Sequence, residues 1–226
     1  MKALLFLLLT VGLYYANRSL QQRYRHRLLT PALGTSLILI AVLELSSSTY
    51  DQYMADAHWL PWLLGPATVA FALPIYQSRA LIRKHWLALT LGCCAGIVAS
   101  LVSSVVLGRV LGLDDNSAHS LLARSVSTPF ALEATRHLGG SAQLTGLFVM
   151  ITGLFGLLMG EAILKRLPIR MRIARGAPFG AAAHGFGLNA ARSIGAEEGA
   201  VASLTMIFSG ILMVLLAPEL APLLAG

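Results

Sequence analysis

Uncharged, apolar runs separated by short polar segments make up most of the chain. Seven runs have this character, and they cover residues 3–17, 28–43, 59–78, 86–108, 138–160, 176–191 and 199–218. A helix needs about 20 mostly apolar residues to cross a bilayer, and the longer runs reach this length. The pattern therefore predicts an all-α, polytopic membrane protein with about seven spans.

One segment departs from this pattern. Residues 116–123 and 125–132 are uncharged stretches of eight residues each, separated by Arg124 and too short to cross a bilayer. Hydroxyl side chains and a proline follow in Ser125-Val126-Ser127-Thr128-Pro129. Irregular backbone at membrane depth is tolerated only where protein buries it or where it lines a wet cavity. The segment is therefore the first candidate for a ligand site, and the alternative is an ordinary extramembrane loop with short amphipathic helices.

The distribution of charge predicts which loops face the cytoplasm. Charged residues are 12% of the chain, against about 25% in soluble domains. Twelve of the 17 basic residues fall in three short loops, within residues 18–27, 79–84 and 165–175. The positive-inside rule places these loops in the cytoplasm, with the N-terminus outside and the C-terminus cytoplasmic. The net charge of +7 thus reflects topology, and no nucleic-acid partner is predicted. The alternative for residues 3–17 is a signal peptide, which the basic residues directly after the run disfavour.

The predicted sides of the flanking loops indicate how the short central segment lies in the membrane. Asp114 and Asp115 should lie outside and the 165–175 loop inside, with one clean span between them. Residues 113–137 should therefore enter and leave on the external side as a re-entrant hairpin. We expect a single membrane domain over residues 1–226. Its predicted parts are an N-terminal anchor helix with a basic loop (1–27), a first repeat (28–112), the hairpin (113–137) and a second repeat (138–226).

The two predicted repeats have opposite orientations, and each has an interrupted middle span. The interruptions are Gly65-Pro66-Ala67-Thr68 and Gly176-Ala177-Pro178-Phe179-Gly180. Segments broken by Gly and Pro at matching places in two inverted halves are typical of transporter binding sites. The pattern therefore favours a secondary transporter with its site near mid-membrane.

The candidate chemistry is that of a small-anion site. Broken helices expose N–H groups and a positive dipole end, Arg124 can bind a carboxylate through two N–H groups, and His184 can carry a proton near neutral pH. The candidate substrate-binding residues are Pro66, Thr68, Arg124, Ser125, Ser127, Thr128, Pro129, His184, Gly185, Asn189 and Arg192. The alternatives are that Arg124 extends to the external interface and that His184 is a hydrogen-bonded packing residue. No phosphate loop, nucleophile elbow or metal-ligand spacing is present in the sequence, so neither an enzyme nor a cofactor nor a metal is predicted.

Three motifs together resemble the LrgB/CidB family of bacterial membrane proteins, whose domain also forms part of the plastid glycolate/glycerate translocator. They are Leu64-Gly65-Pro66-Ala67-Thr68-Val69-Ala70, Arg124-Ser125-Val126-Ser127-Thr128-Pro129 and His184-Gly185-Phe186-Gly187-Leu188-Asn189. The family usually has Lys at the position of Arg124 and Thr at the position of Leu188. The first change keeps the charge but alters its geometry, and the second removes a hydroxyl.

The resemblance implies two functions. The favoured one is export or exchange of small monocarboxylates such as glycolate, glycerate or pyruvate across the bacterial inner membrane, with a coupled proton or cation. The other is an antiholin-like regulator of murein hydrolase activity and autolysis that works with a small LrgA/CidA-type membrane partner. Small residues along 92–108 and 146–160 would also suit a homo-oligomer.

Overall fold

The computed structural model describes residues 4–24 and 30–224, apart from the side chains of residues 32, 223 and 224. Within these residues every regular element is a helix, so the predicted all-α class is confirmed. The chain forms two compact units, Met1–Ala67 and Thr68–Gly226. Each unit is described by itself.

The first unit is built around a helix pair. It contains α1 (Leu5–Tyr24), α2 (Pro31–Leu45), α3 (Tyr50–Ala57), α4 (Trp59–Trp62) and the start of α5 (Leu64–Ala70). In α1 the buried Asn17 donates from Nδ2 to Thr35 Oγ1 of α2 at 3.4 Å, beside Gly34, where a larger residue would collide with it. Arg18 and Arg23 lie within α1, which corrects the prediction that they belong to a loop, and Arg25 and Arg27 fall outside the described residues.

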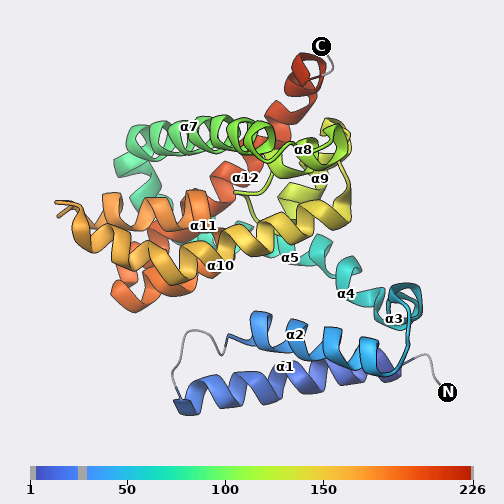
Figure 1. Cartoon of the computed structure of the whole chain (residues 1–226). Coiled ribbons are helices and arrows are strands. Elements are labelled where there is room, and N and C mark those ends of the chain that lie inside the picture. The colour runs from blue at the N-terminus through green and yellow to red at the C-terminus, as the bar shows by residue number, and fades with distance from the viewer. Residues whose placement is uncertain (1–3, 25–29, 225–226) are drawn as a thin grey trace. The chain divides into compact units, whose positions relative to one another are not determined.

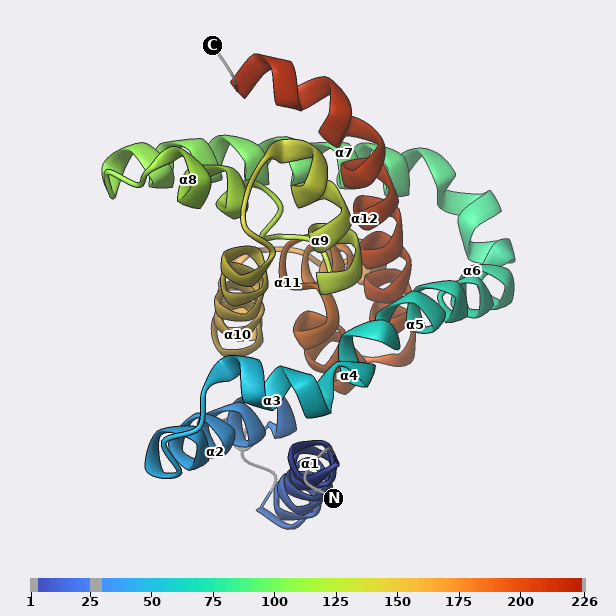
Figure 2. The same ribbon diagram turned by 90° about the vertical axis from the view of Figure 1, so that its right-hand side faces the viewer.

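The second unit holds the main core. Its helices are α6 (Ala72–Gln77), α7 (Arg79–Val110), α8 (Asp115–Leu122), α9 (Thr128–Leu138), α10 (Ala142–Arg166), α11 (Arg172–Ile194) and α12 (Ala196–Leu224). In Figure 2, α9 lies between α10 and α12, and it packs on both. The largest core cluster joins the segment before α9 to its neighbours, with Val126 packed among residues that include Ile97, Val149 and Ile207.

Four segments of the described chain are long and apolar enough to cross a membrane. They are Trp59–Gln77, Arg79–Val110, Ala142–Arg166 and Ala196–Pro222. The first is divided into α4, α5 and α6, and Gly65-Pro66 stands in the first turn of α5, as the sequence indicated for a broken span. The prediction of seven spans is not confirmed, since in α2 the apolar part, Leu33–Leu45, is shorter than a span.

α8 and α9 form a helix hairpin, as the short stretches around Arg124 predicted. α8 runs back along α7, with Ala118 against Gly108 and with Ser104 Oγ donating to Leu121 O at 3.1 Å. α9 then returns along α10, where Thr135 Oγ1 and Thr145 Oγ1 are 2.9 Å apart. Both ends of the hairpin therefore lie at the N-terminal end of α10. Its tip is the non-helical segment 123–127.

α11 is a second hairpin, and this corrects the prediction that residues 176–191 cross the membrane. Arg172 at its beginning pairs with Glu197 of α12 at 3.3 Å, and Arg175 pairs with Glu198 at 3.8 Å. At its other end the helix leads directly into α12, where Gly199 packs on Arg192. Both ends of α11 therefore lie together. The chain turns at His184, with φ 38° and ψ −130°, and not at Gly176–Gly180 as predicted.

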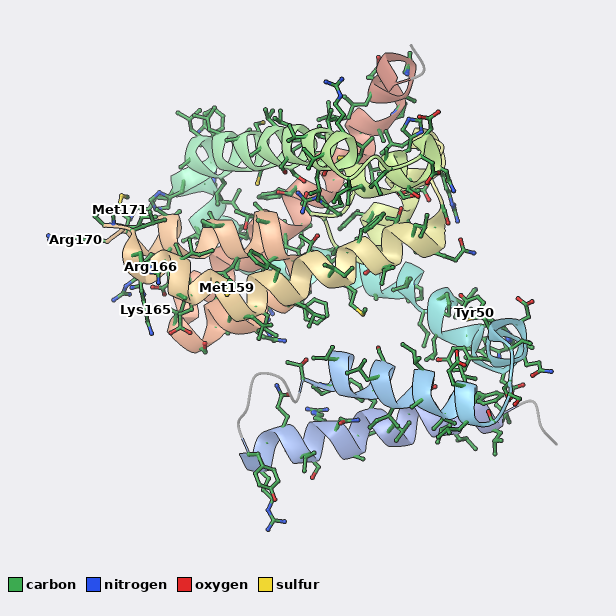
Figure 3. All side chains as sticks on the ribbon, viewed as in Figure 1. Tyr50, Met159, Lys165, Arg166, Arg170 and Met171 are labelled. Atoms are coloured by element: carbon green, nitrogen blue, oxygen red, sulfur yellow. The ribbon has the colours of Figure 1, made fainter. Side chains whose placement is uncertain are left out.

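The two hairpins enter from opposite ends of α10. Figure 1 shows α8 and α9 at one end, and the beginnings of α11 and α12 at the other. Lys165, Arg166 and Arg170 gather at this second end, which we call the basic end (Figure 3). α12 runs from the basic end past α9, where Phe130 lies against Gly210. The far end of α12 and the 165–175 loop therefore lie at opposite ends of the second unit.

Candidate functional site

A cavity of about 710 Å³ lies within the second unit. Its walls are α7 and α10, which pack little on each other, and its floor is the first half of α11. The tip of the α8–α9 hairpin contributes Arg124 and Ser125. The cavity is lined at the basic end by apolar side chains such as Leu167, Ile169 and Ala174. Small-molecule sites typically measure about 300–1,000 Å³, so the volume fits one.

Arg124 forms the polar inner end of this cavity. Its Nε donates to Ser104 Oγ at 2.9 Å and its Nη2 to Ser103 Oγ at 2.9 Å, both on α7. Its Nη1 makes a longer contact of 3.5 Å with Thr152 Oγ1 on α10. The side chain thus joins two helices that are otherwise separated by the cavity.

The partners of Arg124 among the described residues are all neutral. Within the described residues no carboxylate lies at ion-pair distance from its guanidinium, and the nearby hairpin carboxylate Glu133 pairs with Arg136 at 2.9 Å. A guanidinium has five N–H groups, of which three are used here. Because a membrane-embedded charge is costly without a partner, this arrangement favours an anionic ligand.

Two serines, Ser125 and Ser127, follow Arg124 on the hairpin tip. Ser125 is buried and lines the cavity. Ser127 precedes α9 as its N-cap residue, yet its side chain makes no cap hydrogen bond, and its buried Oγ has no partner. Ser127 does not line the cavity, and neither do Thr128 and Pro129, which follow it half-buried in the first turn of α9.

His184 faces α10 and not the cavity. Its Nε2–H donates to Val149 O at 3.0 Å, and its ring meets Phe186 edge-on with the centroids 5.8 Å apart. The side chain is 3% exposed, and Gly153 of α10 leaves the room that it occupies. Of the two sequence interpretations, this geometry fits the hydrogen-bonded packing residue.

The structure does not bring the other candidate residues to the cavity. Gly185, Asn189 and Arg192 are exposed on the second half of α11. Pro66 is exposed in the first unit, and Thr68 opens the second. Of the predicted residues, Arg124 and Ser125 line the cavity. Ala181 to Ala183, which were not predicted, line it just before His184.

Sequence reasoning missed the hydroxyls of α7 and α10. The small residues along 92–108 were interpreted as a face for a homo-oligomer, whereas Ser100, Ser103 and Thr152 line the cavity and Ser104 binds Arg124. A signal was present in the sequence, because Ser100, Ser103 and Ser104 have the i, i+3, i+4 spacing of one helix face.

These features define a multi-pass helical membrane protein with two opposed helix hairpins and a cationic site between them. Residues 10–223 match the LrgB-like family, and the chain belongs to this family. It is 32% identical over 220 residues to the holin-like protein CidB of Staphylococcus epidermidis, covering 97% of this chain and 96% of that protein.

Two further relatives are similar over nearly their full length. The holin-like protein CidB of Staphylococcus aureus is 32% identical over 219 residues, covering 97% of this chain and 96% of the relative. The uncharacterized protein YxaC of Bacillus subtilis is 33% identical over 210 residues, covering 93% and 91%. No solved structure matches the chain.

Proposed function

We propose that this protein is a secondary transporter of small monocarboxylates of the glycolate, glycerate or pyruvate type across the bacterial cytoplasmic membrane. The observation that carries the proposal is the guanidinium of Arg124 at the inner end of the cavity, with hydroxyl partners and no described carboxylate in reach. The protein would be non-enzymatic, as the holin-like names of its relatives also indicate.

The chemistry of the inner end suits a carboxylate. Arg124 retains two N–H groups beyond those that bind hydroxyls, and an arginine fork matches the two oxygens of a carboxylate. Ser125 adds a hydroxyl from the same tip. The remaining lining is mostly Gly, Ala and apolar side chains, so the charge of the ligand would be met only at Arg124.

The opposed hairpins support alternating access. Their tips approach α10 at neighbouring positions, since Arg124 reaches Thr152 and His184 reaches Val149. Movement of one hairpin against the other would expose the site to one side at a time. By the positive-inside rule the basic end is cytoplasmic, so the cavity would be open toward the cytoplasm in this conformation. The far end of α12 would then be external, the reverse of the sequence-based expectation.

The second candidate function is a holin-like or antiholin-like regulator of murein hydrolase activity and autolysis, acting with a small LrgA/CidA-type membrane protein. The printed names of the relatives favour it. Exposed apolar side chains on α10, including Ile151 and Phe155, suit lipid or a second membrane helix. This function would depend on assembly and not on a defined substrate.

Uptake into proteoliposomes tests the two candidates. The purified full chain is reconstituted, and uptake of labelled glycolate is measured with pyruvate and lactate as competitors, with and without a proton gradient. We expect saturable uptake that the competitors reduce. Arg124→Ala should lower it by at least about 100-fold, because hydrogen bonds to a charged group contribute about 1.5–3 kcal/mol each and two are lost.

Arg136→Ala is the matched control, since it removes an exposed arginine of the same hairpin and an ion pair at the surface. It should leave uptake unchanged. No uptake of any monocarboxylate, together with leakage of an unrelated dye, would contradict the transporter and favour the holin-like function. Full uptake by Arg124→Ala would contradict the site.

A further inference from the structure

α7 carries a hydroxyl group that has no hydrogen-bond partner among the described residues. The Oγ of Ser100 is buried, has no hydrogen-bond partner, and belongs to a residue that lines the cavity. A serine inside a helix commonly donates to the carbonyl four residues earlier, and Ser100 does not. Buried polar side-chain atoms are satisfied in the large majority of cases, so an orphan in a cavity wall calls for a ligand.

The place of Ser100 relates it to Arg124. Ser103 and Ser104, which bind the guanidinium, follow Ser100 at i+3 and i+4 on the same helix. One turn of helix rises about 5.4 Å, so Ser100 lies about one turn from the two serines that bind Arg124, toward the basic end. A ligand held by Arg124 would therefore present its next atoms to Ser100.

Ser103 and Ser104 already make hydrogen bonds, so the hydroxyl on this face of α7 that is left for a ligand is that of Ser100. Ser103 Oγ accepts from Arg124 and donates to the backbone oxygen of Ser100 at 2.9 Å. Ser104 Oγ likewise accepts from Arg124 and donates to Leu121 O. Both hydroxyls thus have their donor and an acceptor site engaged, whereas the Ser100 hydroxyl has neither.

We infer that Ser100 recognises the oxygen on carbon 2 of the substrate, and that the protein therefore selects 2-hydroxy and 2-oxo monocarboxylates over unsubstituted ones. A hydroxyl both donates and accepts, so one serine can accept from a 2-hydroxyl or donate to a 2-oxo group. The inference rests on the proposed function. The substrates are those already proposed, and the inference adds Ser100 as the residue that would distinguish them from unsubstituted monocarboxylates.

Small residues form the wall beside Ser100. Gly96 and Ala99 precede Ser100 on α7, and Gly156 faces the cavity from α10. These residues supply no further polar side chain near the 2-position. Selectivity between glycolate and acetate would thus depend on a single hydrogen bond.

The test compares glycolate with acetate in the reconstituted full chain. Wild type should take up glycolate about fivefold better than acetate, the factor that one neutral hydrogen bond of about 1 kcal/mol provides. Ser100→Ala should lower glycolate uptake about fivefold and leave acetate uptake unchanged, so the preference disappears. Ser100→Thr keeps a hydroxyl and should keep part of the preference. Thr90→Ala, which removes an exposed hydroxyl of α7 outside the cavity, is the matched control.

Ligand-induced thermal shifts provide a second readout that does not need transport. Glycolate should raise the melting temperature of wild type and not of Ser100→Ala. Equal losses of glycolate and acetate uptake in Ser100→Ala, or an unchanged preference, would overturn this inference and leave the transporter standing. If wild type neither transports nor is stabilised by any monocarboxylate, both the proposed function and the inference fail.

Discussion

The two helix hairpins of the second unit reach the middle of α10 from opposite ends, but their tips differ in chemistry. The α8–α9 hairpin turns through five residues, 123–127, which include Arg124 and two serines. It is fixed to its neighbours by hydroxyl groups, such as Ser120 Oγ, which accepts from Ser141 N at 2.7 Å. At its tip Arg124 and Ser125 line the cavity, whereas Ser127 Oγ is buried outside it without a partner among the described residues.

The α11 hairpin turns at a single residue and is rich in Gly and Ala. His184 adopts a positive φ of 38°, a conformation that costs a non-glycine residue about 1–3 kcal/mol. The hairpin packs by close approach, with Phe179 against Gly160 and Ala183 against Gly156 of α10. Two ion pairs close its base, at Arg172 and Arg175.

This difference in the chemistry of the two tips indicates that the hairpins have separate functions. The first carries the groups that would bind a ligand, and the second provides a smooth, closely packed surface that forms the cavity floor. Substitutions at the first tip should therefore change ligand binding and spare stability, whereas substitutions in the second should do the reverse. Substitutions in each hairpin test this division, and we expect the greatest change from close packing in α11.

Substitutions that disturb the packing of the α11 hairpin should lower the stability of the protein most. A methyl group at Gly180 would meet the backbone oxygen of Ala202 and Thr205 Oγ1 of α12, whereas one at Gly146 of α10 would meet no atom within 4 Å. Gly180→Ala should destabilise by about 3 kcal/mol, the upper part of the range for overpacking. At about 2–4 °C per kcal/mol, the melting temperature in detergent should fall by roughly 6–12 °C.

Two controls connect this result to the comparison. Gly146→Ala should be neutral or stabilise by up to about 1 kcal/mol, since alanine is the better helix former. Ser127→Ala at the other tip should leave the melting temperature nearly unchanged, because its hydroxyl has no partner to lose. A Gly180→Ala protein as stable as Gly146→Ala would show that α11 and α12 do not pack as described.

The backbone at His184 should give an intermediate effect. Both His184→Ala and His184→Gly lose the hydrogen bond to Val149 O, worth about 1 kcal/mol. Glycine adopts positive φ without strain, and alanine does not. The Gly variant should therefore be more stable than the Ala variant by about 1–2 kcal/mol in thermal or denaturant unfolding. The usual order, with Ala above Gly in a helix, would refute the turn at His184.

The sequence predicted the first hairpin better than the second, for a physical reason. Arg124 and Glu133 interrupt the apolar pattern, so the short helices around them were visible in the charges alone. No charge marks the turn of α11, and Gly176 to Gly180 attracted the prediction of a break that the structure places at His184. A positive φ at a histidine depends on the packing around it, which local sequence does not contain.

The predicted membrane crossing by residues 176–191 was also wrong for this helix, α11. Because residues 176–191 were predicted to cross the membrane, the charged residues after them were expected on the side opposite the 165–175 loop. The structure instead pairs Arg172 with Glu197. Opposite charges at the two ends of a run fit a hairpin as well as a span, and only the contact between them decides. Of the site, Arg124 and Ser125 were predictable as buried polar residues, whereas Ser103 and Thr152 depended on the fold.

The beginnings of the two hairpins should differ in their response to acid, which is the smallest effect expected. Asp114 caps α8, with Oδ1 and Oδ2 accepting from Ser117 Oγ at 2.6 Å and Ser117 N at 3.2 Å. These hydrogen bonds lower the pKa of the Asp114 carboxyl below its ordinary value of 3.8. The N-cap residue of α11 is Met171, whose side chain makes no cap hydrogen bond.

Because the folded-state pKa of Asp114 is depressed, its contribution to stability is present above the unfolded value and is lost as the pH falls through the folded one. Asp114→Asn keeps a capping side chain but cannot titrate. Wild type should be slightly more stable than Asp114→Asn at pH 7, since a negative charge suits a helix N-terminus. This advantage should shrink as the pH falls below about 4. Melting temperatures of both proteins across this pH range measure it, and a difference that stays constant with pH would show that the Asp114 cap contributes nothing through its charge.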